Sequence, residues 1–134
     1  MKKASIALIL FFALISCKKG SSNDPVPDDP NVVKLSRTDT AKIITIQKGK
    51  IIAITLGNPG DDGYLFNTWH YDATILHLDS HEHTLAADPS LVGNFGTDTW
   101  RFSTLQVGTT TVHMSASRSK TDSLNMFNHI IKVE

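Results

Sequence analysis

The amino-acid sequence predicts an all-β fold, a β-sandwich formed by residues 32–134. Three observations lead to this prediction. Apolar and polar residues alternate over several short windows, which is the pattern of half-buried strands. β-branched and aromatic residues are concentrated in those windows, and no window shows a sustained helical period. Turns that contain glycine separate the windows within about 100 residues, as in sandwich folds.

The expected strands follow one another closely along the chain. In the clearest windows every second residue is apolar and is expected to face the core, as Trp100 and Phe102 do in "TWRFSTL". The polar segment "DSHEHTLAADPS" interrupts this pattern and is interpreted as a loop. The strands are expected at or near 32–36, 42–47, 50–56, 64–71, 74–79, 99–105, 109–116 and 127–133.

The apolar faces of these strands are expected to form one core. Trp69, Tyr71, Trp100 and Phe102 lie at strand spacing, and we interpret them as core residues rather than as a platform for stacking on sugars. The other side chains expected to face inward are Ile44, Ile46, Ile52, Ile54, Leu56, Val112, Met114, Ala116, Phe127, Ile131 and Val133.

The first 31 residues are not expected to belong to the sandwich. "MKK" is a basic start, and the apolar run "ASIALILFFALIS" that follows is shorter than the roughly 20 residues that span a bilayer. This combination is typical of a secretory signal, and we assign residues 1–16 to a signal peptide. Residues 17–31 are rich in Gly, Ser, Pro and Asp and are interpreted as a flexible tether.

Cys17 follows the apolar run in "LISC", which resembles a bacterial lipobox. In that motif the peptide is cut before the cysteine, and the cysteine is lipidated. The resemblance implies a membrane anchor at Cys17 and a place in the bacterial cell envelope, on the periplasmic face or the cell surface. Because Cys17 is the only cysteine, no intrachain disulfide and no catalytic cysteine are expected.

Composition and motifs exclude several classes of function. The whole chain has 13 basic and 13 acidic residues, so it lacks the basic surplus that marks a nucleic-acid-binding surface. No nucleophile elbow, phosphate-binding glycine loop or metalloprotease motif is present in the sequence. We therefore expect neither an enzyme nor a cofactor.

The stretch "GNPGDDGY", residues 57–64, connects two strand windows with an unusual composition. Pro59 fixes its own φ and favours an extended Asn58, and Gly63 can adopt a positive φ where the chain re-enters the sheet. A loop restrained in this way loses less entropy when it binds a partner. Asp61 and Asp62 are also compatible with an ordinary solvated turn.

Three segments together resemble the chagasin family of cysteine protease inhibitors. "ITIQKGKIIAITLGNP" is similar to the opening strand pair of that family, and "NPGDDGYLF" to its Asn-Pro loop. "LVGNFGTDTWRFSTLQVGTTTVHM" is similar to its glycine-rich loop with the aromatic strand that follows. The third loop begins at Arg118. The resemblance covers about residues 41–134.

The resemblance implies an immunoglobulin-like sandwich with three functional loops at one end. It also implies non-covalent insertion of these loops into the active-site cleft of a papain-like cysteine protease, by a protein expected to be a monomer. The protease-binding residues it implies are Asn58, Pro59, Gly60, Asp61, Asp62, Gly63, Tyr64, Gly93, Asn94, Phe95, Gly96, Arg118, Ser119 and Lys120.

Two features depart from the family pattern and leave an alternative function open. Gly60, Asp61 and Asp62 stand where the family has two threonines, and Ser119 and Lys120 follow Arg118 where the family has Pro-Trp. The alternative is an immunoglobulin-like envelope module that binds a protein or glycan and has lost inhibition.

The stretch "HLDSHEH" raises a separate possibility. In a regular extended segment, alternate residues project to one side, and three imidazoles with a carboxylate suit zinc. The other interpretation is a strand end that runs into a polar turn with solvated histidines. The candidate ligands would be His77, Asp79, His81 and His83.

Overall fold

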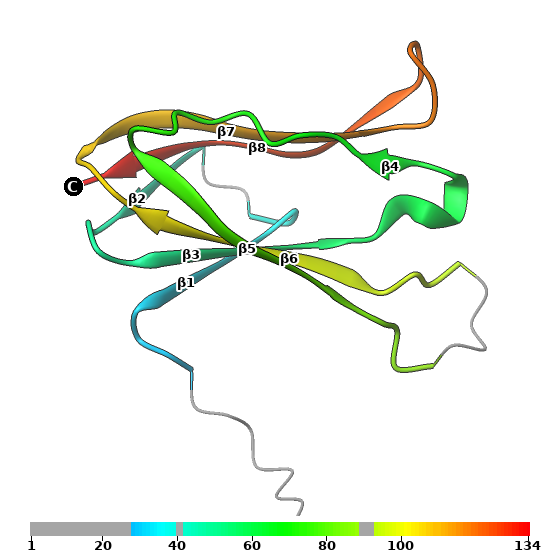
Figure 1. Ribbon diagram of the computed structural model, residues 1–134, viewed down its shortest axis with the longest axis horizontal. Coiled ribbons are helices and arrows are strands. Elements are labelled where there is room, and N and C mark those ends of the chain that lie inside the picture. The colour runs from blue at the N-terminus through cyan, green and yellow to red at the C-terminus, as the bar shows by residue number, and fades with distance from the viewer. Residues whose placement is uncertain (1–27, 40–41, 89–92) are drawn as a thin grey trace, which may run out of the picture.

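The computed structural model describes residues 28–39, 42–88 and 93–134 (Figure 1). The signal peptide predicted for residues 1–16, the lipidation site Cys17 and the tether as far as residue 27 lie outside the described residues. No helix in the described part of the chain has the length and apolar character that crossing a membrane requires.

The protein is a sandwich of two four-stranded sheets, in the orders β1-β3-β6-β5 and β2-β8-β7-β4. Antiparallel pairs dominate, while β1 runs parallel to β3 and β2 parallel to β8. The predicted all-β fold is confirmed. The elements are β1 (Val32–Ser36), β2 (Ile43–Ile46), β3 (Ile51–Gly57), the 3₁₀ turn η1 (Pro59–Asp62), β4 (Leu65–Phe66), β5 (Leu76–Thr84), β6 (Thr97–Thr104), β7 (Gly108–Ser117) and β8 (Ser123–Val133).

The core lies between the two sheets and is formed by the alternating residues that the sequence indicated. Trp69 packs edge-on against Trp100, with ring centroids 5.4 Å apart, and edge-on against Phe102 at the same distance. Such T-shaped pairs are the preferred arrangement of aromatic rings. The interpretation as core residues is therefore correct for Trp69, Trp100 and Phe102, while Tyr71 is partly buried and packs against this core. The largest fully buried side chains are Phe102, Ile52, Ile54, Leu56, Leu76, Met114, Ile131, Val112 and Val133.

The strand expected at 64–71 is shorter than predicted. Regular pairing with β7 is confined to Leu65 and Phe66, and His70 then forms an isolated bridge with His113. Between them Trp69 turns into the core, which interrupts the alternation of a paired strand. Asn67 keeps this segment close to β7, because its N–H donates to the carbonyl of Ser115 at 2.8 Å.

The strand expected at 74–79 is longer than predicted and extends to Thr84. The interpretation of residues 79–90 as a loop is wrong for their first half, because polar side chains on an edge strand can remain solvated while the backbone pairs with β6. The pairing shifts register between Leu78 and Ser80. A bulge of this kind adds one residue to one strand and reverses the faces to which its later side chains point.

The strand pairing gathers three connections at one end of the sandwich (Figure 1). The last pair of β3 with β6 is Gly57 with Thr97, so the segments after β3 and before β6 are neighbours. Leu65 pairs with Ser117, which brings the β7–β8 turn to the same end. At the other end of the sandwich, Val32 at the start of β1 pairs with Ile51 at the start of β3. The start of β1 is therefore separated from the three connections by the length of β3, about 20 Å.

Truncation in the core tests this arrangement. Phe102→Ala removes a fully buried ring that packs against Trp69 and Tyr71, and it should lower the free energy of unfolding by about 3–5 kcal/mol. Denaturant unfolding measures this change. The control Leu105→Ala, at an exposed site, should change the free energy by at most about 0.5 kcal/mol. Equal effects of the two substitutions would contradict the assigned core.

Candidate functional site

The Asn-Pro loop, residues 57–64, has a defined internal geometry. Asn58 is extended, with φ −71° and ψ 123°, as a residue before proline should be. Its Oδ1 accepts a hydrogen bond from the Gly60 N–H at 2.9 Å and so caps the single 3₁₀ turn η1. Gly63 closes the turn at φ 76°, in the left-handed region, and its N–H donates to the Gly60 carbonyl at 3.0 Å. The extended conformation predicted for Asn58 and the positive φ predicted for Gly63 are confirmed.

The Asn-Pro loop divides into an exposed centre and a buried end. Asp61 and Asp62 are exposed at the tip. Tyr64, in contrast, has only 8% of its surface exposed and belongs to the core cluster. The loop therefore presents two carboxylates, while its aromatic residue fastens the loop to the sandwich.

The glycine loop, residues 93–96, lies directly against the Asn-Pro loop. The Asn58 N–H donates to the Gly96 carbonyl at 3.0 Å. A methyl group at Gly60 would stand 3.4 Å from Cδ1 of Phe95, so the half-exposed Phe95 ring faces the Gly60 backbone. A methyl group at Gly93 would stand 2.7 Å from Oδ2 of Asp61. Glycine is favoured at position 93 by its φ of 90°, which lies in the left-handed region. At Gly60 the tightest contact of an added methyl group would be with Oδ1 of Asn58 in the same loop, at 2.9 Å.

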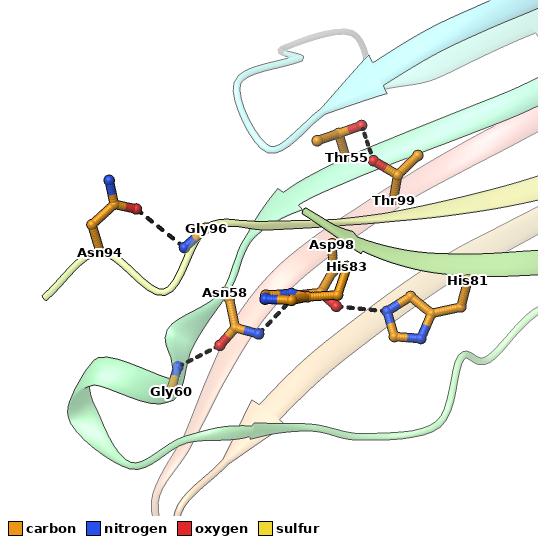
Figure 2. Close-up of polar contacts among 9 residues, drawn as sticks. All are labelled: Thr55, Asn58, Gly60, His81, His83, Asn94, Gly96, Asp98 and Thr99. Atoms are coloured by element: carbon orange, nitrogen blue, oxygen red, sulfur yellow. Dashed lines mark hydrogen bonds and ion pairs between the residues drawn. The ribbon is translucent and has the colours of Figure 1, made fainter. Parts of the chain in front are cut away.

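Within the glycine loop, an asparagine fixes the path of the backbone. Oδ1 of Asn94 accepts a hydrogen bond from the Gly96 N–H at 3.1 Å (Figure 2). Gly96 itself has φ 81°, and a methyl group on it would meet the Thr84 carbonyl oxygen at 2.0 Å. Val92, at the other end of this motif, lies outside the described residues.

The arginine loop, residues 118–122, lies against the opposite side of the Asn-Pro loop. The Arg118 guanidinium donates to Oδ2 of Asp122 from Nε at 3.0 Å and from Nη2 at 2.6 Å. Nη1 donates to the Asp62 carbonyl at 3.4 Å, and the guanidinium carbon stands 5.0 Å from the Tyr64 ring centroid. Arg118 thus connects two loops, whereas Ser119 and Lys120 are exposed at the tip.

Tyr64 and Asp122 form the second bond between these two loops. The Tyr64 hydroxyl donates to Oδ1 of Asp122 at 2.5 Å. This hydrogen bond raises the pKa of Tyr64 above its ordinary value, because it stabilises the protonated phenol. It also lowers the pKa of Asp122, to which Arg118 adds a further hydrogen bond and its positive charge. The loop is therefore held by an ionised carboxylate.

Asp98 lies beneath the Asn-Pro and glycine loops with 3% of its surface exposed. Its Oδ2 accepts from Nδ2 of Asn58 at 2.7 Å and from Nδ1 of His83 at 3.2 Å, and its Oδ1 accepts from Nε2 of His81 at 2.6 Å (Figure 2). Burial raises the pKa of Asp98, but these three hydrogen bonds outweigh that effect, and the pKa is lowered overall.

Asp98 and Asp122 were not among the site residues predicted from the sequence. A signal for Asp98 was present, because it is in phase with Trp100 and Phe102 and so occupies an inward position of β6. A carboxylate at such a position needs hydrogen-bond donors from neighbouring strands. For Asp122 the signal was its spacing of four residues from Arg118 across a turn.

The four candidate metal ligands do not form one cluster. The bulge in β5 separates them: His77 pairs with the outward Ser103, and Asp79 accepts from the Ser103 hydroxyl at 2.5 Å. His81 and His83 lie beyond the bulge, where both contact Asp98. Within residues 28–39, 42–88 and 93–134, no group of three or more His, Cys, Asp or Glu side chains is arranged to hold a metal ion.

The family follows from the sequence of the sandwich. A model of the chagasin family of peptidase inhibitors matches residues 45–131, well over half of the chain. The chain belongs to the chagasin family. Because this is a family of protease inhibitors, the expectation that the chain is not an enzyme is confirmed. A search of curated proteins gave no match.

Solved structures show the same fold. The cysteine protease inhibitor EhICP2 from Entamoeba histolytica superposes with a TM-score of 0.67 at 21% identity, over 77% of this chain and 96% of that one. The solution structure of amebosin gives 0.56 at 22% identity, over 79% and 100%. PbICP-C, solved in complex with falcipain-2, gives 0.53 at 14% identity, over 77% and 98%. The immunoglobulin-like fold implied by the chagasin resemblance is confirmed.

The bond between Tyr64 and Asp122 is testable by titration. The chain has two tyrosines, so in Tyr71→Phe the phenolate absorbance reports Tyr64 alone. Its pKa should lie above 10.0 and should fall when Asp122→Ala is added, because the carboxylate that accepts from the phenol is then absent. Circular dichroism at each pH confirms that the protein is folded. An unchanged tyrosine pKa would contradict the assigned bond.

Asp98 should make stability depend on pH in the acid range. The pKa of Asp98 is lower in the folded protein than in the unfolded chain, where it is about 3.9. The stabilisation that the ionised carboxylate adds to the free energy of unfolding is therefore complete above about pH 3.9, and it is lost as the pH falls through the pKa of the folded state. Below about pH 4, the free energy of unfolding should therefore fall more steeply with decreasing pH in the natural protein than in Asp98→Asn. Denaturant unfolding at each pH measures the free energy of unfolding of both proteins. The same dependence on pH in the two proteins would contradict the lowered pKa of Asp98.

Proposed function

We propose that this chagasin-family protein is a lipid-anchored inhibitor of papain-like cysteine proteases, which blocks the active-site cleft by non-covalent insertion of its loops. The observation that supports this most strongly is the convergence of the three loops at one end of the sandwich, each bonded to its neighbour. A cleft needs a narrow projecting surface, and three loops side by side provide one.

The internal bonds of the loops favour binding. The Asn-Pro loop is held by the glycine loop through Asn58 and by the arginine loop through Asp62. Little conformational entropy then remains to be lost on insertion, so more of the contact energy appears as affinity. This restraint also opposes a change of the loop into the conformation that a protease needs for cleavage.

The exposed side chains at the tip are those that would contact the active-site cleft of a protease. Phe95 has 51% and Leu65 has 74% of its surface exposed, and both flank the Asn-Pro loop. Phe95 is an aromatic anchor of the type that dominates interface energies, and it compensates for the tryptophan missing after Arg118. Asp61 and Asp62 complement the imidazolium of a cysteine protease, which carries the charge that activates the thiolate.

The proposed anchor at Cys17 would orient the molecule. The described chain enters at residues 28–31, beside the start of β3, and the loops lie beyond the opposite end of the same strand (Figure 1). An anchored molecule would therefore direct its loops away from the membrane, toward proteases in the periplasm or outside the cell. Binding as a monomer fits this arrangement, because all three loops belong to a single chain.

Titration of papain with the full-length chain in mild detergent tests the proposal. Activity toward a small peptide substrate should fall at micromolar or lower concentration, and trypsin, which has no catalytic thiolate, should remain active. The control Leu105→Ala, at the far end of the sandwich, should inhibit equally well. A folded protein that leaves papain and a cathepsin fully active would refute the proposal.

The alternative, a binding module that has lost inhibition, makes a different prediction for the centre of the Asn-Pro loop. The exposure of Asp61 and Asp62 supports this alternative, because an unpaired carboxylate is costly to desolvate in a tight cleft. If the natural chain is inactive and the double substitution Asp61→Thr with Asp62→Thr restores inhibition, the loop serves another ligand. If the natural chain inhibits, the alternative is excluded.

A further inference from the structure

Asp98 occupies an inward position of β6, between Leu56 of β3 and His83 of β5. Three donors converge on its two oxygens: the side-chain amide of Asn58 and the imidazoles of His81 and His83. An ionised carboxylate accepts at both oxygens and donates at neither. Asp98 therefore fits this position because every neighbour that reaches it is a donor.

This arrangement determines which way the side-chain amide of Asn58 faces. Because Asp98 only accepts, Nδ2 of Asn58 must point toward it, and Oδ1 is left to face the Gly60 N–H. The reversed amide would place Oδ1 against the carboxylate and an NH₂ group against the Gly60 N–H, with both contacts repulsive. The cap of η1 thus depends on a residue outside the loop.

The two histidines connect Asp98 to the rigid part of the sandwich. His81 stacks on Trp100, with ring centroids 4.5 Å apart and planes within 4°, and Trp100 belongs to the buried aromatic cluster. His83 is the direct cross-strand neighbour of Asp98. Both histidines lie on the inner side of β5 only because the bulge between Leu78 and Ser80 reverses the alternation.

We infer that Asp98 is the positioning residue of the inhibitory surface: held by His81 and His83, it fixes the Asn58 amide and thereby the conformation of the Asn-Pro loop. This inference deepens the proposed function and rests on it. Asp98 is buried, so it acts on a protease only through Asn58.

Amide hydrogen exchange tests the positioning directly and without a protease. In Asp98→Asn, one acceptor oxygen is replaced by a donor, and exchange at the Gly60 amide should become about tenfold faster. His83→Ala removes one donor at a partly exposed site and should accelerate the same amide to a smaller extent. His83→Asn places an amide nitrogen where Nδ1 of His83 stands, so the Gly60 amide of this variant should exchange as fast as in the natural chain.

Inhibition of papain by the same full-length proteins tests the consequence. The inhibition constant should rise about tenfold in Asp98→Asn, rise less in His83→Ala and return to the natural value in His83→Asn. The matched control is Thr104→Val, which removes bonds of a buried hydroxyl to the Gly49 N–H and the Lys50 carbonyl at the far end. Thr104→Val should lower the melting temperature while leaving the exchange rate of the Gly60 amide and the inhibition constant unchanged.

The outcomes separate the two proposals. Unchanged exchange at Gly60 in Asp98→Asn and His83→Ala would overturn the positioning role whatever the inhibition data show. Faster exchange with unchanged inhibition constants would overturn the link between positioning and inhibition. A natural chain that does not inhibit, combined with faster exchange in the variants, would refute the proposed function and support the positioning role. If Asp98→Asn does not fold, the positioning role is tested by comparing exchange at the Gly60 amide in His83→Ala and in His83→Asn, and equal exchange rates in these two variants would overturn it.

Discussion

The register of β3 against β6 is the constraint on which the rest of the molecule depends. It places Trp100 and Phe102 opposite Ile54 and Ile52, and so builds the centre of the core. The same register carries Asp98 to the inner face at the end of the strand. A shift by one residue would expose both aromatic rings and turn the carboxylate outward. The burial of the aromatic rings therefore fixes the position of a polar group that supports the loops.

The fold followed from the sequence because alternation is a local property. The windows around Ile52, Trp100 and Val112 each show their buried face without reference to any other strand. The frame of the Asn-Pro loop was predictable for the same reason, because proline and glycine restrict the backbone at their own positions and at the residue before proline. The resemblance to a family then related these loops to one another, which local pattern does not do.

The contacts that hold the loops were less predictable because their partners are distant in sequence. Asn58, His81 and Asp98 meet through the pairing of three strands, and the bulge in β5 decides which side its histidines take. A run of alternating histidines and acids does not reveal an added residue in the pairing. Tyr64 and Asp122 meet across the two sides of a loop cluster in the same way. Side-chain function was therefore harder to predict than strand position.

All the bonds described between the loops are hydrogen bonds, ion pairs or ring contacts, and the single cysteine of the chain lies far from them in sequence. Many small secreted domains stiffen their loops with disulfides instead. Papain-like proteases are active only while their catalytic thiol is reduced, and the reductants that maintain this thiol also open accessible disulfides. A loop cluster fastened by carboxylates keeps its shape under those conditions. The molecule can thus remain rigid in the chemical environment in which its proposed targets are most active.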